Sequence, residues 1–135
     1  MESPEPQRTI RILLAEDNPA DVYLIEEALR EHNVLFEITV ATDGEAAIDL
    51  VTRQGMRPDI VLLDLNMPKR SGGEVLDALR KEAGVGLPVI ILTSSDSPAD
   101  RDQALRLGAT CYIRKPTGLD EFLQIGATIK GLVKV

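Results

Sequence analysis

The sequence predicts a doubly wound α/β fold. Short apolar runs alternate five times with segments of helical periodicity, the connections are short, and each apolar run ends in polar residues. Such alternation indicates a parallel sheet with right-handed crossovers and helices on both faces. A closed barrel needs eight strand–helix units and about 250 residues, whereas this chain has 135 residues. We therefore expect the flavodoxin-like strand order 2-1-3-4-5.

The expected strands are short and rich in branched apolar residues. They cover residues 10–15, 35–41, 60–63, 87–92 and 109–113. The run Ile-Val-Leu-Leu at 60–63 is apolar throughout, which is typical of a strand buried on both faces.

The expected helices follow these strands and begin at recognisable capping residues. The first starts at Asn18-Pro19, with Asn as N-cap and Pro at the first helical position, and runs to about Glu31. The third follows Gly72-Gly73. Capping-box patterns predict the starts of the second, fourth and fifth helices; they lie at residues 42–45, 97–100 and 117–120.

Composition excludes several classes of function. The net charge of −7 argues against a surface for nucleic acid or membrane. The single cysteine excludes an internal disulfide and fits a cytoplasmic location. No stretch is long and apolar enough to span a bilayer. We expect residues 1–8 to form a flexible tail without a signal peptide, and residues 9–135 to form one domain.

Acidic residues follow two of the expected strands. Glu16 and Asp17 come after the first strand, and Asp64 ends the third. In the 2-1-3-4-5 order these strands are neighbours, so the three carboxylates should crowd together and repel one another. Mg²⁺, or Mn²⁺ in its place, would relieve this repulsion, because it takes oxygen ligands and keeps several waters. Asn66 is the expected source of a backbone carbonyl ligand.

The remaining strand ends carry a hydroxyl and an ammonium group. Thr93 follows the fourth strand and Lys115 the fifth. Both groups suit the oxygens of a phosphoryl group. Together with a carboxylate and Mg²⁺ they form an apparatus for phosphoryl transfer, with Asp64 as the nucleophile that becomes phosphorylated.

Each of these residues taken alone also has a simple structural interpretation. Asp64 could cap a turn, the pair Glu16-Asp17 could favour a helix dipole, and Thr93 and Lys115 could be ordinary loop and surface residues. The functional interpretation depends on their joint occurrence at the ends of four different strands.

With these residues, the sequence resembles the receiver domain of two-component response regulators over about residues 8 to 133. The matching motifs are Glu16-Asp17, Asp64-Leu65-Asn66-Met67-Pro68, Ser71-Gly72, Thr93, Tyr112 and Lys115-Pro116. The resemblance implies that Asp64 accepts a phosphoryl group from the phosphohistidine of a histidine kinase. It also implies that Thr93 and Tyr112 act as switch residues, and that the Lys115–Pro116 bond is cis. Asn66 and Ser95 would modulate hydrolysis of the aspartyl phosphate.

A finer resemblance connects the chain to single-domain regulators associated with bacterial phytochromes, so the kinase could be such a phytochrome. The family would signal through a face made of the fourth strand, fourth helix, fifth strand and fifth helix. Because the sequence ends soon after the last helix, we expect output by contact with an unknown downstream protein. A homodimer through the last helix is left open.

Three other functions are considered. The domain could be a phosphate shuttle or sink with no output of its own. A Mg²⁺-dependent phosphohydrolase would need a substrate pocket and a second acid, and the sequence offers neither. A binding module that works without phosphorylation would leave the acidic cluster and Lys115 unexplained. We therefore expect a signalling domain that catalyses only its own phosphorylation and dephosphorylation, not a true enzyme.

Overall fold

The computed structural model describes residues 8–135, in which strands and helices alternate as expected. The strands are β1 (Ile10–Ala15), β2 (Phe36–Ala41), β3 (Ile60–Leu63), β4 (Val89–Thr93) and β5 (Cys111–Arg114). The helices are α1 (Pro19–Glu31), α2 (Gly44–Thr52), α3 (Gly72–Ala83), α4 (Pro98–Arg106), α5 (Leu119–Leu123) and α6 (Ile125–Val133). All pairs of neighbouring strands are parallel, and the order β2-β1-β3-β4-β5 confirms the predicted topology.

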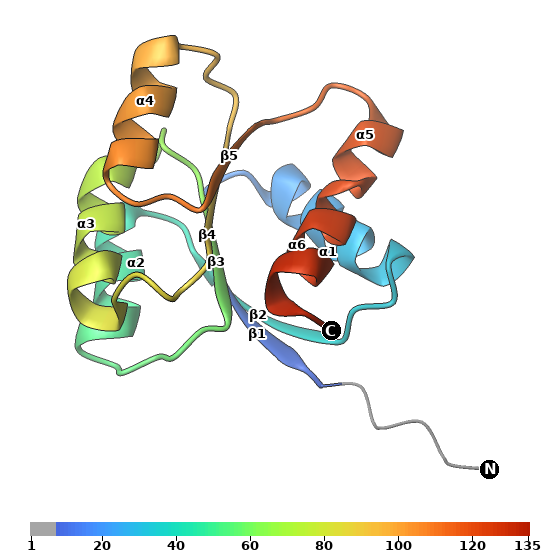
Figure 1. Cartoon of the computed structure of the whole chain (residues 1–135), viewed down its shortest axis with the longest axis horizontal. Helices are drawn as coiled ribbons and strands as arrows, with labels where there is room; N and C mark the ends of the chain where they lie inside the picture. The colour runs from blue at the N-terminus through green and yellow to red at the C-terminus, as the bar shows by residue number, and fades with distance from the viewer. Residues whose placement is uncertain (1–7) are drawn as a thin grey trace.

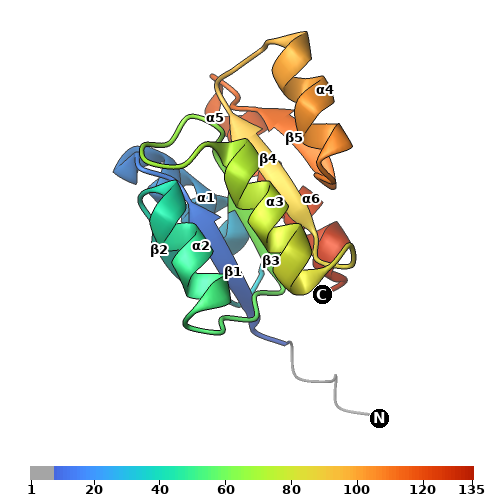
Figure 2. The ribbon, with the colours of Figure 1, turned by 90° about the vertical axis from the view of Figure 1, so that its left-hand side faces the viewer.

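The helices form one layer on each face of the sheet (Figure 1). Helices α1, α5 and α6 cover one face, and α2, α3 and α4 cover the other, which faces the viewer in Figure 2. The side chains of β3 alternate between the two cores: Val61 and Leu63 point to the second layer, and Ile60 and Leu62 to the first. All four are fully shielded from solvent, so β3 is buried on both faces as predicted.

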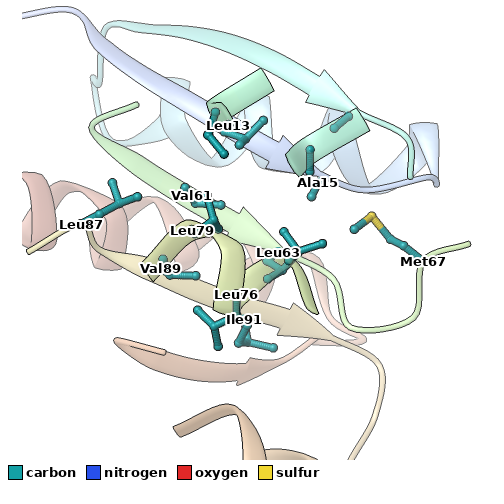
Figure 3. Close-up of a cluster of buried hydrophobic side chains, with 14 of the residues drawn as sticks. Leu13, Ala15, Val61, Leu63, Met67, Leu76, Leu79, Leu87, Val89 and Ile91 are labelled. Atoms are coloured by element: carbon teal, nitrogen blue, oxygen red, sulfur yellow. The ribbon is translucent and has the colours of Figure 1, made fainter. Parts of the chain in front are cut away.

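The core under α2 and α3 also holds the loop that follows β3 (Figure 3). Leu63 of β3 and Leu76 of α3 belong to this cluster, and Met67 enters it from the loop. Burial of a side chain of this size contributes about 1.5–3 kcal/mol. The loop just beyond Asp64 is therefore held by apolar packing as well as by its backbone.

The helix starts confirm some predicted caps and correct others. Asn18 and Ser97 cap α1 and α4, because each side chain accepts a backbone N–H of the first turn. The cap of α2 is Asp43, not the predicted Thr42, and its hydrogen bond from the backbone lowers the pKa of the Asp43 carboxyl. A charged carboxylate is a stronger acceptor than a hydroxyl. At α5 the cap is Gly118, which has no side chain to accept a bond, so the third predicted capping box is wrong.

The last predicted helix is interrupted at Gln124, which separates α5 from α6. The N–H of Gln124 donates to the carbonyl of Glu121 at 3.2 Å, and the N–H of Ala127 donates to the carbonyl of Gln124 at 3.0 Å. These three-residue bonds tighten the turn as in a 3₁₀-helix. The backbone of Gln124 stays helical at φ −65° and ψ −17°, so Phe122 and Ile125 still reach the same core.

The predicted tail, residues 1–8, lies outside the described residues except for Arg8. The guanidinium of Arg8 donates to the carboxylate of Asp59 at 3.0 Å and to the carbonyl of Val133 at 3.1 Å. Arg8 therefore contacts the folded domain, and the division into a tail at residues 1–8 and a domain at residues 9–135 stays a prediction. Between residues 8 and 135, no helix has the length and apolar character needed to cross a membrane.

Gly126 marks the closest approach of α6 to α1. A Cβ atom at this position would collide with the backbone carbonyl of Ala28, so Gly126→Ala should lower the free energy of unfolding by about 1–3 kcal/mol. A Cβ atom at Gly131 in the same helix would meet nothing within 4 Å. Gly131→Ala should therefore leave the free energy of unfolding unchanged or raise it by up to about 1 kcal/mol. Urea unfolding followed by circular dichroism measures both. Equal stabilities of the two variants would contradict this account of the α1–α6 contact.

Candidate functional site

Glu16 and Asp64 stand side by side at the carboxyl edge of the sheet because β1 and β3 are neighbours in register. Ala15 is paired with Leu63, and the Asp64 N–H donates to the Ala15 carbonyl at 3.0 Å. The ladder thus continues one residue beyond β3 and sets the position of both carboxylates. Glu16 is only 2% exposed and Asp64 only 5%. Burying two carboxylates costs free energy unless cations or hydrogen-bond donors compensate.

The predicted acidic cluster is brought together. Glu16, Asp17 and Asp64 each offer a carboxylate oxygen, and these oxygens lie within 4.8 Å of one another. Burial raises the pKa of Glu16, and the nearby charge of Asp64 adds to this shift. The set fits a hard divalent cation such as Mg²⁺ or Mn²⁺, because all its donors are oxygens and the exposed Asp17 leaves room for water ligands. The backbone N–H of Asn66 donates to Asp64 at 3.0 Å; a role for its carbonyl as a metal ligand stays a prediction.

The ammonium group of Lys115 compensates the buried carboxylates. Its Nζ lies 2.9 Å from Asp64 Oδ2, 3.0 Å from Glu16 Oε2 and 2.7 Å from Asp21 Oδ2. Burial alone would lower the pKa of Lys115, but the hydrogen bonds to the three carboxylates outweigh it and raise the pKa above its ordinary value. Lys115 is therefore charged at neutral pH.

Asp21 is the site residue that sequence reasoning missed. It lies in the first turn of α1, where an acidic residue is expected simply because it favours the helix dipole. The signal available in the sequence was that α1 begins at the same sheet edge as Glu16. Only the tertiary structure shows that the carboxylate turns toward Lys115.

A second group of hydrogen bonds surrounds Thr93, which is fully buried at the end of β4. Its Oγ1 accepts from the Asn66 side chain at 3.3 Å and from the Ser95 N–H at 3.4 Å, so its own proton can be donated into the site. The hydroxyl of Tyr112 donates to the Ser95 carbonyl at 3.0 Å, and Ser95 Oγ donates to the carboxylate of Asp100 at 2.6 Å. The predicted switch residues are thus joined through one loop, from β4 to α4 and β5.

The expected cis bond at Lys115–Pro116 is not found. Residues 8–135 contain no cis peptide bond, so this bond is trans. Trans is the isomer that X–Pro bonds favour, by about 0.5–1 kcal/mol. In this geometry the Lys115 N–H donates to the Thr93 carbonyl at 2.7 Å while the ammonium reaches Asp64. Lys115 thus reaches the site with the Lys115–Pro116 bond in the trans form.

The chain belongs to the family of response regulator receiver domains. The family model matches residues 12–126, a span that holds the acidic cluster, Thr93 and Lys115. This is a family of signalling domains that are phosphorylated by histidine kinases.

Two similar proteins support the assignment to this family. Response regulator Rcp1 of Synechocystis is 34% identical over 120 residues, which cover 84% of this chain and 82% of Rcp1. The probable transcriptional regulatory protein TcrX of Mycobacterium tuberculosis is 39% identical over 112 residues, 83% of this chain but 46% of TcrX. The chain thus spans about half the length of TcrX.

Two solved structures show the same fold. The phosphorylated cyanobacterial phytochrome response regulator RcpA has a TM-score of 0.83 and 34% identity, and the match covers 94% of this chain and 95% of RcpA. The Mn²⁺-bound form of Rcp1 has a TM-score of 0.80 and 33% identity, and the match covers 90% of this chain and 92% of that one.

Removal of the Lys115 charge tests its structural role. Lys115→Met leaves Glu16 and Asp64 buried without this ammonium, so the free energy of unfolding at neutral pH should fall by about 3 kcal/mol. The loss should shrink as the pH falls, because burial raises the pKa of Glu16, and without the ammonium this carboxyl takes up a proton more readily in the folded than in the unfolded protein. Chemical unfolding at neutral and mildly acidic pH measures this.

The control for this test is Lys81→Met. Lys81 pairs with Asp77 on the exposed surface of α3, and loss of such a pair should change stability by less than about 0.5 kcal/mol. A loss of the same size in both variants would contradict the role assigned to Lys115.

Proposed function

We propose that the protein is a phosphoacceptor signalling domain in which Asp64 accepts a phosphoryl group from a phosphohistidine of a histidine kinase. The observation that carries the proposal is the juxtaposition at one sheet edge of Asp64, two further carboxylates and Lys115. Membership of the receiver family supports the same reaction.

In this reaction a carboxylate oxygen of Asp64 attacks the phosphorus atom, and the bond from phosphorus to the histidine nitrogen breaks. The electron pair of that bond returns to the imidazole, so no general base is needed on the acceptor side. Lys115 and the hydroxyl of Thr93 would donate to the phosphoryl oxygens. A divalent cation held by Glu16, Asp17 and Asp64, with the Asn66 carbonyl, would neutralise charge on the transferred group.

The hydrogen bonds around Thr93 suggest how phosphorylation would be read. Movement of Thr93 toward a phosphoryl oxygen would break its bonds to Asn66 and Ser95, and Ser95 also holds Tyr112 and Asp100. The signal would then reach the face formed by β4, α4, β5 and α5, where a downstream protein would bind. This is a two-state packing change biased by a local charge. Asn66 and Ser95 would modulate hydrolysis of the aspartyl phosphate.

The similarity to RcpA, which is a phytochrome response regulator, favours a bacterial phytochrome as the kinase. Such a pathway would operate in the cytoplasm. If the protein relays its phosphoryl group to another protein instead of binding a target, it is a shuttle or sink that uses the same chemistry at Asp64.

The acceptor residue is tested with a small phosphodonor. Incubation with acetyl phosphate and Mg²⁺ should add one phosphoryl group to the wild type, seen by intact-mass spectrometry, and add none to Asp64→Asn, whose amide is a poor nucleophile. Asp77→Asn, an exposed site on α3, should be phosphorylated like the wild type. Undiminished phosphorylation of Asp64→Asn would overturn the assignment, and steady release of phosphate far beyond one equivalent would favour the phosphohydrolase.

The metal site is tested by thermal unfolding. Mg²⁺ should raise the Tm of the wild type in proportion to the logarithm of its concentration above the Kd, because it binds the folded state. The shift should be largely lost in Asp17→Asn, which removes one negative charge from the cluster and leaves only a weaker amide oxygen, and kept in Asp49→Asn, an acid on α2 outside the cluster. An equal shift in all three proteins would place the metal elsewhere.

A further inference from the structure

Lys115 divides its three ammonium donors among three carboxylates, and Asp21 makes the shortest of the contacts. The distances from Nζ are 2.7 Å to Asp21, 2.9 Å to Asp64 and 3.0 Å to Glu16. The side chains of Lys115 and Asp21 are 14% and 15% exposed, so water screens this pair only weakly. An ammonium group has three N–H donors, so each one already has an acceptor.

Asp21 differs from the other two partners in its place in the site. Glu16 and Asp64 belong to the cluster that fits a cation, whereas Asp21 lies outside that cluster. It is nevertheless held firmly, because its helix begins at the site: the Asn18 N–H donates to Glu16 at 3.1 Å, and the Asn18 side chain accepts from Ala20. The carboxylate of Asp21 is thus fixed beside Lys115 by the start of α1.

We propose that Asp21 is a positioning residue that competes with the phosphoryl group for the ammonium of Lys115, and so restrains phosphorylation. This inference rests on the proposed function. To donate to a phosphoryl oxygen, Lys115 must redirect at least one of its donors. Phosphorylation turns one oxygen of Asp64 into an ester, and a cation would draw charge from Glu16. Of the three partners, Asp21 is the one that is neither esterified by phosphorylation nor part of the cation cluster, so it keeps its attraction for the ammonium in both states.

Charge acts in the same direction as this competition. Four carboxylates lie at this edge, those of Glu16, Asp17, Asp21 and Asp64, and three of them pair with the ammonium of Lys115. An incoming phosphoryl group is itself an anion, so each of these carboxylates opposes its approach. Removing the charge of Asp21 leaves the three clustered acids intact, so it should favour the phosphorylated state without removing an oxygen of the cation cluster.

The experiment uses fluoroberyllate, which imitates a phosphoryl group on a carboxylate, in the presence of saturating Mg²⁺. Asp21→Asn keeps the shape of the side chain but replaces a charge-assisted hydrogen bond by a weaker neutral one. We expect fluoroberyllate to bind Asp21→Asn roughly fivefold more tightly than the wild type. Glu31→Gln makes the same change of charge at the exposed far end of α1 and should bind like the wild type.

Two further measurements separate direct contact from a general charge effect. The gain in affinity should persist at high ionic strength, because the buried pair is poorly screened. The NMR signal of the Lys115 ammonium in fluoroberyllate-free protein should shift or broaden in Asp21→Asn and stay unchanged in Glu31→Gln. A change in the ammonium signal reports on Lys115 itself. A general loss of stability in α1 would not change this signal selectively.

Unchanged or weaker binding in Asp21→Asn would overturn the inference. So would a gain in affinity that disappears at high ionic strength, or an unchanged Lys115 signal. No binding by the wild type would contradict the proposed function, and the inference with it. Normal binding by the wild type with unchanged affinity in Asp21→Asn would remove only the role of Asp21.

Discussion

The site depends on the ion pairs that the ammonium of Lys115 makes with three carboxylates. The ammonium lies within 3.0 Å of carboxylates from three parts of the chain, namely the end of β1, the end of β3 and the first turn of α1. Without this ammonium, the nearly buried carboxylates of Glu16 and Asp64 would lose their compensating charge, and the folded protein would lose stability. An ionised carboxylate is what a nucleophile for phosphoryl transfer requires.

The parallel sheet explains why such residues meet at all. Each strand delivers its next residue to the same edge, and the pairings of β1 with β3 and of β4 with β5 place Glu16 beside Asp64 and carry Lys115 just past Thr93. Side chains on both faces of the sheet hold this edge in place, since every side chain of β3 is buried; Figure 3 shows one of the two clusters, with Val61 and Leu63. Phosphoryl transfer depends mainly on positioning and electrostatics, which such a scaffold supplies.

The same edge of the sheet also contains the hydrogen bonds that connect the site to α4 and β5. Thr93 is joined to Asn66 on one side and to Ser95 on the other, and Ser95 contacts both Tyr112 and Asp100. Charge at Asp64 and packing at α4 are therefore separated by a few hydrogen bonds. In the mechanism that we propose, two opposing influences would act on Lys115, because the phosphoryl group would attract it and Asp21 would retain it. The balance between them would set how readily the domain enters its phosphorylated state.

The sequence by itself determined the strand order and the residues at the strand ends, because apolar runs and the polar residues that stop them are local signals. It thereby identified Glu16, Asp17, Asp64, Thr93 and Lys115 as residues that would converge at one edge. The tertiary structure decided features that depend on side-chain direction and on competition between neighbours. It turned Asp21 toward Lys115, kept the Lys115–Pro116 bond trans, made Asp43 rather than Thr42 the cap of α2, and interrupted the last helix at Gln124. The choices of proline isomer and helix cap involve differences of about 1 kcal/mol between local alternatives, and the direction of Asp21 depends on Lys115, which lies far away in the sequence. Only the packed structure selects among such alternatives.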